Sequence, residues 1–193
     1  MVRKQQRDDF RVEPLAKAHD RANFSCGIEP LDSYLREQAS KDVAKHAAVC
    51  FVLTPDGKTV AGYYTLSQYS VDVVKLPEEM AKKLPKYPEA PTTLLGRLAV
   101  SERFRGQKLG EFLLLDALYR RWQQGKQVAS AAVIVDAKDE AAKRFYEYFE
   151  FIPLPDTPRR LFLPMRTIEN LFSDDERFNA AQWALLPTSF PAA

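Results

Sequence analysis

The stretch at residues 94–146 constrains the fold more than any other part of the chain, because its pattern alternates between strand and helix. It reads as an apolar strand, a basic turn with glycines, a long helix, a second apolar strand and a helix that contains a tyrosine. The turn at 105–110 would aim several backbone N–H groups at one point, where a helix begins. Unpaired amides and the positive end of a helix bind anions. The sequence therefore predicts an anion-binding turn at residues 105–110.

The order of the predicted elements indicates an α/β domain with a mixed central β-sheet flanked by helices. Apolar periodicity predicts helices at 31–46, 109–124 and 138–149, and a shorter helical piece at 78–84. Strands are expected at 10–15, 47–53, 60–69, 94–100, 131–135, 151–154 and 161–165, with a turn at 155–158. The proline-rich segment 76–91 should break regular structure, and it could be an insertion near the substrate. After residue 168 we expect a short helix and a proline-rich end, with Trp183 and Phe190 as candidate anchors.

Composition limits the classes of function. With 193 residues, of which 46% are hydrophobic and 28% charged, the chain is expected to form one soluble domain. It has no apolar run of about 20 residues and no secretory signal, so we expect a cytoplasmic protein without a membrane partner. The two cysteines and two histidines do not make a zinc site, and no metal is predicted. No Gly-x-Ser-x-Gly or P-loop motif occurs, which argues against those enzymes.

The turn at 105–110 resembles the acetyl-CoA pyrophosphate loop of the GNAT acetyltransferase superfamily, with the pattern Arg/Gln, two residues, Gly, one residue, Gly/Ala. Here these positions hold Arg105, Lys108 and Gly110, so a lysine replaces the middle glycine. A side chain at this position could obstruct the phosphates, whereas a lysine pointing away would add a favourable charge. The resemblance implies a GNAT fold, acetyl-CoA as co-substrate, an acetyltransferase domain at 1–167 and a C-terminal extension at 168–193.

Longer motifs resemble one branch of that superfamily, the GNAT-type toxins of bacterial type II toxin–antitoxin modules. They lie at 24–35, 95–100, 141–147 and 151–165 and begin with Phe-Ser-Cys-Gly, Leu-Gly-Arg-Leu, Ala-Ala-Lys-Arg and Phe-Ile-Pro-Leu. The resemblance implies acetylation of the α-amino group of aminoacyl-tRNA, which blocks translation. It also implies a small ribbon-helix-helix antitoxin as partner and leaves a homodimer open. Two other functions stay open: an N-acetyltransferase acting on a protein or small-molecule amine, and a non-catalytic binding module.

The resemblance also implies roles for particular residues. The active-site tyrosine of the family falls on Tyr146. Acetyl-CoA would be bound by the strand that holds the thioester and the turn that holds the pyrophosphate: Leu98, Ala99, Val100, Arg105, Gly106, Gln107, Lys108, Leu109 and Gly110. The candidates for binding tRNA are three arginines, whose positive charge suits phosphates: Arg97, Arg159 and Arg160.

The implied reaction needs a donor for a tetrahedral oxyanion and a proton for the thiolate that leaves. A backbone N–H near Ala99 or Val100 could stabilise the oxyanion. Tyr146, with an ordinary pKa of about 10 against about 8.5 for a thiol, can donate a proton to a thiolate hydrogen-bonded to it. No residue stands out as a general base. This favours an α-amine, with a pKa of about 7.7 to 8, over a lysine amine, with a pKa of about 10.4.

Overall fold

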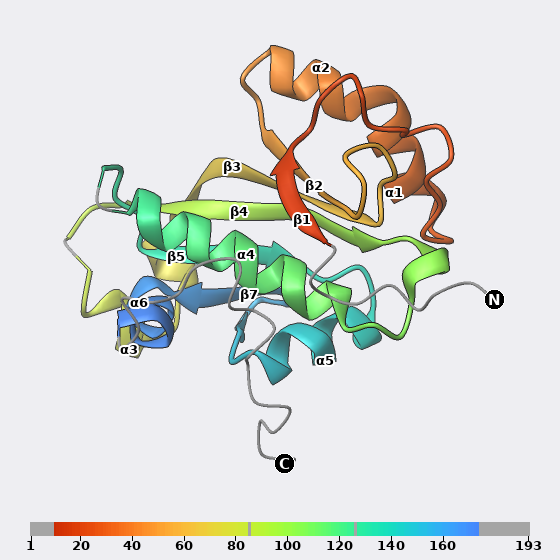
Figure 1. Cartoon of the computed structure of the whole chain (residues 1–193). Helices are drawn as coiled ribbons and strands as arrows, with labels where there is room; N and C mark the ends of the chain where they lie inside the picture. Colours follow the sequence, from red (N-terminus) through yellow and green to blue (C-terminus); the bar gives the residue numbers. More distant parts are fainter. Residues whose placement is uncertain (1–9, 85, 126, 174–193) are drawn as a thin grey trace.

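The computed structural model describes residues 10–84, 86–125 and 127–173. These residues form a seven-stranded mixed sheet in the order β1-β2-β3-β4-β5-β7-β6, in which only β4 and β5 are parallel (Figure 1). The strands are β1 (Arg11–Pro14), β2 (Val49–Thr54), β3 (Gly62–Asp72), β4 (Glu89–Val100), β5 (Ala132–Asp136), β6 (Ile152–Leu154) and β7 (Thr157–Pro164). The helices are α1 (Glu29–Ser33), the π-helix η2 (Tyr34–Gln38), α2 (Ala39–Ala44), the 3-10 helices η3 (Val73–Lys75) and η4 (Glu102–Phe104), α3 (Glu78–Ala81), α4 (Leu109–Gln124), α5 (Glu140–Tyr148) and α6 (Met165–Ser173).

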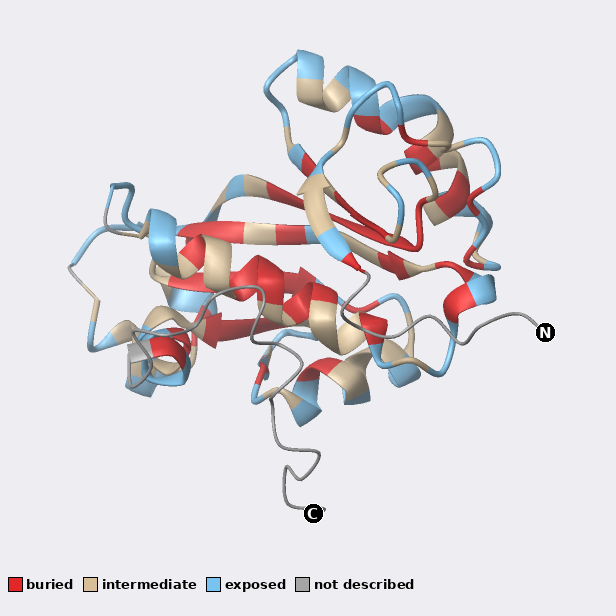
Figure 2. Ribbon diagram, in the orientation of Figure 1, coloured by how far each residue is buried: buried red, intermediate tan, exposed pale blue. Residues whose placement is uncertain are grey.

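Helices cover both faces of the sheet and divide the core into three clusters. α4, α5 and α6 pack on one face, where Leu113 and Val135 are fully buried. On the other face, η2 and α2 bury Leu35 against Tyr63 of β3. The third cluster joins α3 to β5 through Ile134. Buried residues follow the central strands and one side of α4, as expected for a helix between the sheet and other layers (Figure 2). The predicted α/β class with a mixed sheet is confirmed.

β4 is longer than predicted, because it begins at Glu89 and includes Pro91. Pro91 pairs with Ser70 of β3, and its carbonyl accepts a hydrogen bond from Ala131 N–H at 2.7 Å. The proline nitrogen, which has no N–H to donate, therefore faces the β5 side. The ladder with β5 begins only at Thr93, so no ladder hydrogen bond is lost at Pro91. The expectation that prolines break the whole segment 76–91 is wrong for its last residues.

The helix predicted at 31–46 consists of three pieces, which run from Glu29 to Ala44. Ala39 N–H donates to Tyr34 O, which is the i→i+5 bond of a π-helix. The wider turn leaves both Tyr34 and Leu35 buried against the sheet. Periodicity alone does not reveal such a turn, because it shifts the apolar face by only one residue.

The last described elements also differ from the expectation. β7 begins at Thr157, which pairs with Leu154, so the turn between β6 and β7 is shorter than the one predicted at 155–158. α6 begins at Met165 and continues past residue 167, and its Phe172 ring lies 5.4 Å from the Tyr119 ring of α4. The division into a domain at 1–167 and an extension at 168–193 stays a prediction. Trp183 and Phe190 lie outside the described residues.

Candidate functional site

The predicted anion-binding turn lies between η4 and α4. Gly106 and Lys108 both have left-handed backbone, with φ of 77° and 56°. Among the described side chains, none caps the start of α4, whereas the carboxylate of Asp139 caps α5 by accepting from Ala142 N–H at 2.7 Å. The uncapped end of α4 leaves first-turn N–H groups and the positive end of the helix for an anion.

The backbone of Lys108 supplies a physical reason for glycine at this position of the family pattern. A residue with a Cβ is less stable in the left-handed region by about 1–2 kcal/mol, and glycine avoids this cost. Lys108 is exposed, so its side chain lies at the surface. The main cost of lysine at this position is therefore backbone strain, because its exposed side chain does not obstruct the turn.

β4 separates from β5 next to this turn. The parallel ladder covers only residues 93–95 of β4, and the register with β3 shifts at Gly96, which forms a bulge. Beyond the bulge, Ser101 N–H donates to Ala61 O at 2.8 Å, and backbone N–H groups alternate sides along a strand. The Ala99 amide therefore points toward β3. The amides of Leu98 and Val100 point to the other side, where β5 no longer pairs.

Tyr146 lies in α5 and is buried, with 8% of its surface exposed. Its ring packs against the rings of Phe145 and Phe151, with centroids 5.3 and 5.4 Å away. Within residues 10–84, 86–125 and 127–173, no group makes a hydrogen bond with its hydroxyl. Burial raises the pKa of Tyr146, so the hydroxyl keeps its proton at neutral and mildly alkaline pH. It is therefore available as a proton donor.

Phe145 links the helix that carries Tyr146 to the turn. A methyl group at Gly110 would lie 3.9 Å from the Phe145 ring and 3.9 Å from Val100 Cγ2. The end of β4, the first turn of α4 and the middle of α5 thus meet at one place. We call this place, where Val100 and Gly110 approach Phe145 beside Tyr146, the opening. Val100, Gly110 and Tyr146 were predicted as site residues from three separate segments of the sequence.

Arg105 fastens the turn to the loop at residues 24–28. Its guanidinium donates to Cys26 O at 2.7 Å and lies 3.3 Å from the Glu102 carboxylate. Glu102 N–H also donates to Ser25 O at 2.9 Å. Arg105 therefore holds the turn in place. Its predicted contact with a pyrophosphate stays a prediction.

Arg97 lies on β4 and faces η2. Its guanidinium stacks over the ring of Tyr34, 3.5 Å from the centroid, and the Tyr34 hydroxyl donates to Asp42 at 2.8 Å. Burial is the main reason that the pKa of Tyr34 is raised, while the charge of Arg97 opposes this shift. Sequence reasoning named Arg97 but missed Tyr34 and Asp42. Their spacing of about two helical turns is a signal that they share one helix face.

Arg159 and Arg160 are neighbours on β7 but differ in their contacts. The Arg160 guanidinium donates two hydrogen bonds to the Asp136 carboxylate, at 2.7 and 2.8 Å, and one to the Tyr69 hydroxyl at 2.6 Å. Arg159 lies 3.4 Å from Glu140, and both side chains are exposed. Arg159 is therefore the more available of the two for a phosphate. Neither is brought next to Arg97, which faces η2 from β4.

Residues 12–151 match the model of the Acetyltransferase (GNAT) family. The chain is 32% identical to the probable toxin TacT of Sinorhizobium fredii over 169 residues, which cover 83% of this chain and 93% of that protein. It is 34% identical to the tRNA-acetylating toxin of Mycobacterium tuberculosis over 160 residues, which cover 83% of this chain and 95% of that protein.

Solved structures of two toxins resemble the fold. A tyrosine-to-phenylalanine mutant of KacT has a TM-score of 0.79 and 32% identity, covering 84% of this chain and 99% of that one. AtaT complexed with acetyl-methionyl-tRNA has a TM-score of 0.77 and 31% identity, with the same coverage of 84% and 99%. A tyrosine-to-phenylalanine mutant of AtaT, bound to the C-terminus of the antitoxin AtaR and to acetyl-CoA, has a TM-score of 0.72 and 27% identity, covering 85% and 98%. The match to the family model over residues 12–151 and the identity to both relatives show that this chain belongs to the GNAT acetyltransferase family.

Proposed function

We propose that this chain transfers the acetyl group of acetyl-CoA to the α-amino group of aminoacyl-tRNA, and that it is the toxin of a toxin–antitoxin module. The observation that carries the acetyl transfer is the opening. There the end of β4 has no pairing on its β5 side, no described side chain caps α4, and the Tyr146 hydroxyl has no hydrogen-bond partner among the described residues. The substrate is supported by the likeness to a tRNA-acetylating toxin and to AtaT complexed with acetyl-methionyl-tRNA.

The residues at the opening fit acetyl-CoA, which supplies an acetyl group activated as a thioester. The amides at the start of α4, behind Gly106 and Lys108, would hold the pyrophosphate. A methyl group at Gly106 would have no atom within 4 Å, so space for a ligand exists beside the turn. The Leu98 and Val100 amides would hold the part of the molecule that carries the thioester, and the Ala99 amide serves the sheet.

Two groups would stabilise the transfer. The Leu98 or Val100 N–H would donate to the oxyanion that develops on the thioester carbonyl. The Tyr146 hydroxyl would give its proton to the departing thiolate. Its raised pKa means that the hydroxyl is protonated at neutral pH before the reaction. The nitrogen of the neutral amine becomes positively charged when it attacks, and it then releases a proton to water or buffer, which resupplies the phenol.

Direct attack by the amine fits the chain better than an acetylated cysteine. Burial raises the pKa of Cys26 to about 11 and that of Cys50 to about 12, so neither thiol ionises at neutral pH. With no cysteine thiolate to accept the acetyl group, the amine must reach the thioester in its neutral form. An α-amine, with an ordinary pKa of about 7.7 to 8, has a neutral fraction at neutral pH without a strong base.

The tRNA backbone would be bound by positive side chains outside the opening. Arg159 is the first candidate, because the one ion pair it makes with another described residue is a long contact between exposed side chains. Arg160 would have to leave the Asp136 carboxylate, and Arg97 would have to leave the Tyr34 ring. Phosphate binding by Arg159 should make the affinity for tRNA fall with rising salt.

The partner would be an antitoxin, as in the structure of the AtaT mutant bound to the C-terminus of AtaR. We propose that this antitoxin is a small ribbon-helix-helix protein and that the toxin forms a homodimer in the cytoplasm. Among the helices of the described residues, none has the length and apolar character needed to cross a bilayer.

Labelled acetyl-CoA tests the substrate directly. The enzyme is incubated with aminoacyl-tRNA, with the same tRNA uncharged, and with a lysine-rich protein. We expect label only on the aminoacyl group, released when the ester to tRNA is hydrolysed. Label on the protein and none on the aminoacyl group would replace the proposal by a protein acetyltransferase. Absence of acetyl-CoA binding in calorimetry would leave only the non-catalytic binding module.

A further inference from the structure

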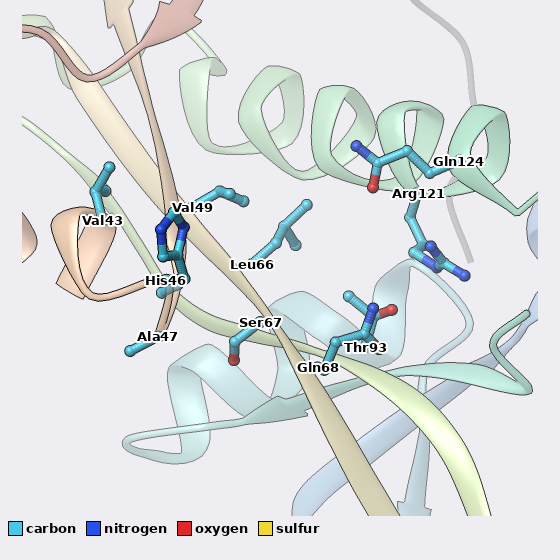
Figure 3. A pocket seen from close by; sticks show the side chains of 11 residues that line it. Val43, His46, Ala47, Val49, Leu66, Ser67, Gln68, Thr93, Arg121 and Gln124 are labelled. Atoms are coloured by element: carbon cyan, nitrogen blue, oxygen red, sulfur yellow. The ribbon is translucent and has the colours of Figure 1, made fainter. Parts of the chain in front are cut away.

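A second site lies at the other end of α4 from the opening. An open groove of about 640 Å³ runs between the α2–β2 connection, β3 and the last turn of α4 (Figure 3). Its apolar wall includes Val43, Val49 and Leu66, and its polar wall includes Gln68, Thr93 and Gln124. Arg121, which lines the groove, is roughly 16 Å along the helix axis from Gly110, so the groove is separate from the opening.

Arg121 is almost fully buried, with 2% of its surface exposed. Its Nη2 donates to Val128 O, whereas its Nε is buried with no hydrogen-bond partner. Among the ion pairs of the described residues, none includes Arg121. Burial lowers the pKa of this guanidinium, and no neighbouring carboxylate offsets the shift. A buried charge without a counter-charge is costly, and proteins rarely keep one without a partner.

The neighbouring Arg120, on the same helix, has hydrogen-bond partners and a counter-charge for its guanidinium. Its Nε donates to the Asp116 carboxylate at 2.8 Å, its Nη2 donates to Val12 O at 3.3 Å, and its guanidinium lies over the Phe51 ring. The helix therefore carries one arginine with a carboxylate and one without. The arginine without a carboxylate, Arg121, lines the groove.

We propose that this groove binds a small molecule that carries a single carboxylate on an apolar body, with Arg121 as its counter-charge. One guanidinium balances one negative charge, and a phosphate dianion would bring a second charge that no other buried cation of the groove offsets. The amides of Gln68 and Gln124 can donate to the second carboxylate oxygen. Val43, Val49 and Leu66 provide an apolar wall for the rest of the molecule. This site does not depend on the proposed acetyl transfer.

Nuclear magnetic resonance on the full-length protein tests the site. The Nε–H signal of Arg121, assigned with Arg121→Lys, is followed during titration with sodium butyrate at constant ionic strength. Butyramide serves as the neutral match, inorganic phosphate as the other anion, and the Nε–H signal of Arg120 as the internal control. We expect a saturable shift of the Arg121 signal with butyrate, with a Kd of about 1 mM, and no comparable shift of the Arg120 signal.

Butyramide should give no saturable shift, and phosphate should bind at least about tenfold more weakly than butyrate. No saturable shift with butyrate, or an equal response to butyramide, would overturn the proposal. Tighter binding of phosphate than of butyrate would overturn the assignment of a carboxylate.

A matched pair of variants tests the same site without changing Arg121. Gln124→Glu places a carboxylate in the groove, and Gln123→Glu places one in the same last turn of α4 but outside the groove lining. Both variants face the same unfavourable helix dipole. Gln124→Glu should abolish the butyrate response and melt at a higher temperature than Gln123→Glu, which should keep the response. Equal butyrate responses in the two variants would contradict the site.

Discussion

Two regions next to α4 each contain a buried tyrosine, but the hydrogen bonding of the two hydroxyls differs. In the first, which we call the Tyr64 network, the Tyr64 hydroxyl donates to Asp116 at 2.5 Å, and Arg120 donates to the same carboxylate at 2.8 Å. At the opening, Tyr146 is also buried, but its hydroxyl has no partner among the described residues. Burial raises the pKa of both tyrosines. Burial alone therefore does not mark a tyrosine for chemistry, whereas a hydroxyl that makes no hydrogen bond to another described residue does.

The Tyr64 network also supports the opening from a distance. Arg120 connects α4 to β1 by donating to Val12 O at 3.3 Å, and Tyr64 connects α4 to β3 through Asp116. These bonds hold the middle of the helix against the sheet. The start of α4 can therefore keep its N–H groups free for a ligand without losing its position.

The largest expected effect is on catalysis by Tyr146→Phe. The rate of acetyl transfer should fall on the order of 10²- to 10⁴-fold, because the proton donor is removed while the ring is kept. The free energy of unfolding should change little, since the hydroxyl makes no hydrogen bond to another described residue. Steady-state kinetics and urea unfolding of the same preparation measure both quantities. Turnover like that of the wild type would remove Tyr146 from the mechanism.

The pH dependence of the rate should show one rising limb. Below the pKa of the attacking α-amine, each pH unit should lower kcat/KM about tenfold, because the ammonium form cannot attack. No falling limb is expected up to about pH 10, since the pKa of Tyr146 is raised above its ordinary value. Stability has the same sign: the free energy of unfolding should fall as the pH rises above about 8.5, where the cysteines of the unfolded chain ionise first, and further above about 10, where its tyrosines ionise. A falling limb near pH 8 would indicate a different acid.

Tyr64→Phe should show the opposite pattern from Tyr146→Phe. The free energy of unfolding should fall by about 1.5–3 kcal/mol, because a hydrogen bond to a buried carboxylate is lost. The rate should change only a few-fold, since Arg120 still holds Asp116. Chemical denaturation and kinetics on this variant complete the comparison. A large loss of rate with unchanged stability would contradict the claim that Tyr64 has a structural role and Tyr146 a catalytic one.

The smallest effect is expected for Lys108→Gly. Glycine relieves a left-handed strain of about 1–2 kcal/mol but loses about 0.5–1 kcal/mol through its freer unfolded chain, so stability should rise by up to about 1.5 kcal/mol. Lys108→Ala removes the same charge but keeps the Cβ, so it should not gain stability. Urea unfolding of the two variants separates the backbone from the charge. Equal stability of the two variants would contradict the role of the backbone.

Local features of the sequence predicted much of this arrangement. The apolar pattern at 109–124 gives the observed bounds of α4, and the strand predicted at 131–135 is displaced by one residue. The resemblance of the turn and of the α5 motif to the GNAT family predicted site residues that lie at or beside the opening. These features depend on short stretches of chain, where pattern and turn chemistry are informative.

Features that depend on partners distant in the sequence could not be predicted. The Asp136–Arg160 pair requires the register of β5 against β7, and the separation of β4 from β5 follows a bulge at Gly96. The hydrogen bond from Tyr64 to Asp116 is another such feature, because nothing in the sequence neighbourhood of Tyr64 reveals Asp116, which lies 52 residues away. The left-handed backbone of Lys108 opposes the preference of lysine, so only the structure could show it.

The central claim is that Tyr146 protonates the departing thiolate. Its most direct test is the rate of acetyl transfer from acetyl thioesters whose leaving thiols differ in acidity, for wild type, Tyr146→Phe and Tyr64→Phe. A more acidic thiol leaves with less help from a proton donor. The ratio of wild-type to Tyr146→Phe rates should therefore shrink as the pKa of the leaving thiol falls, and the ratio for Tyr64→Phe should stay constant. A loss in Tyr146→Phe that is the same for every leaving thiol would contradict the account.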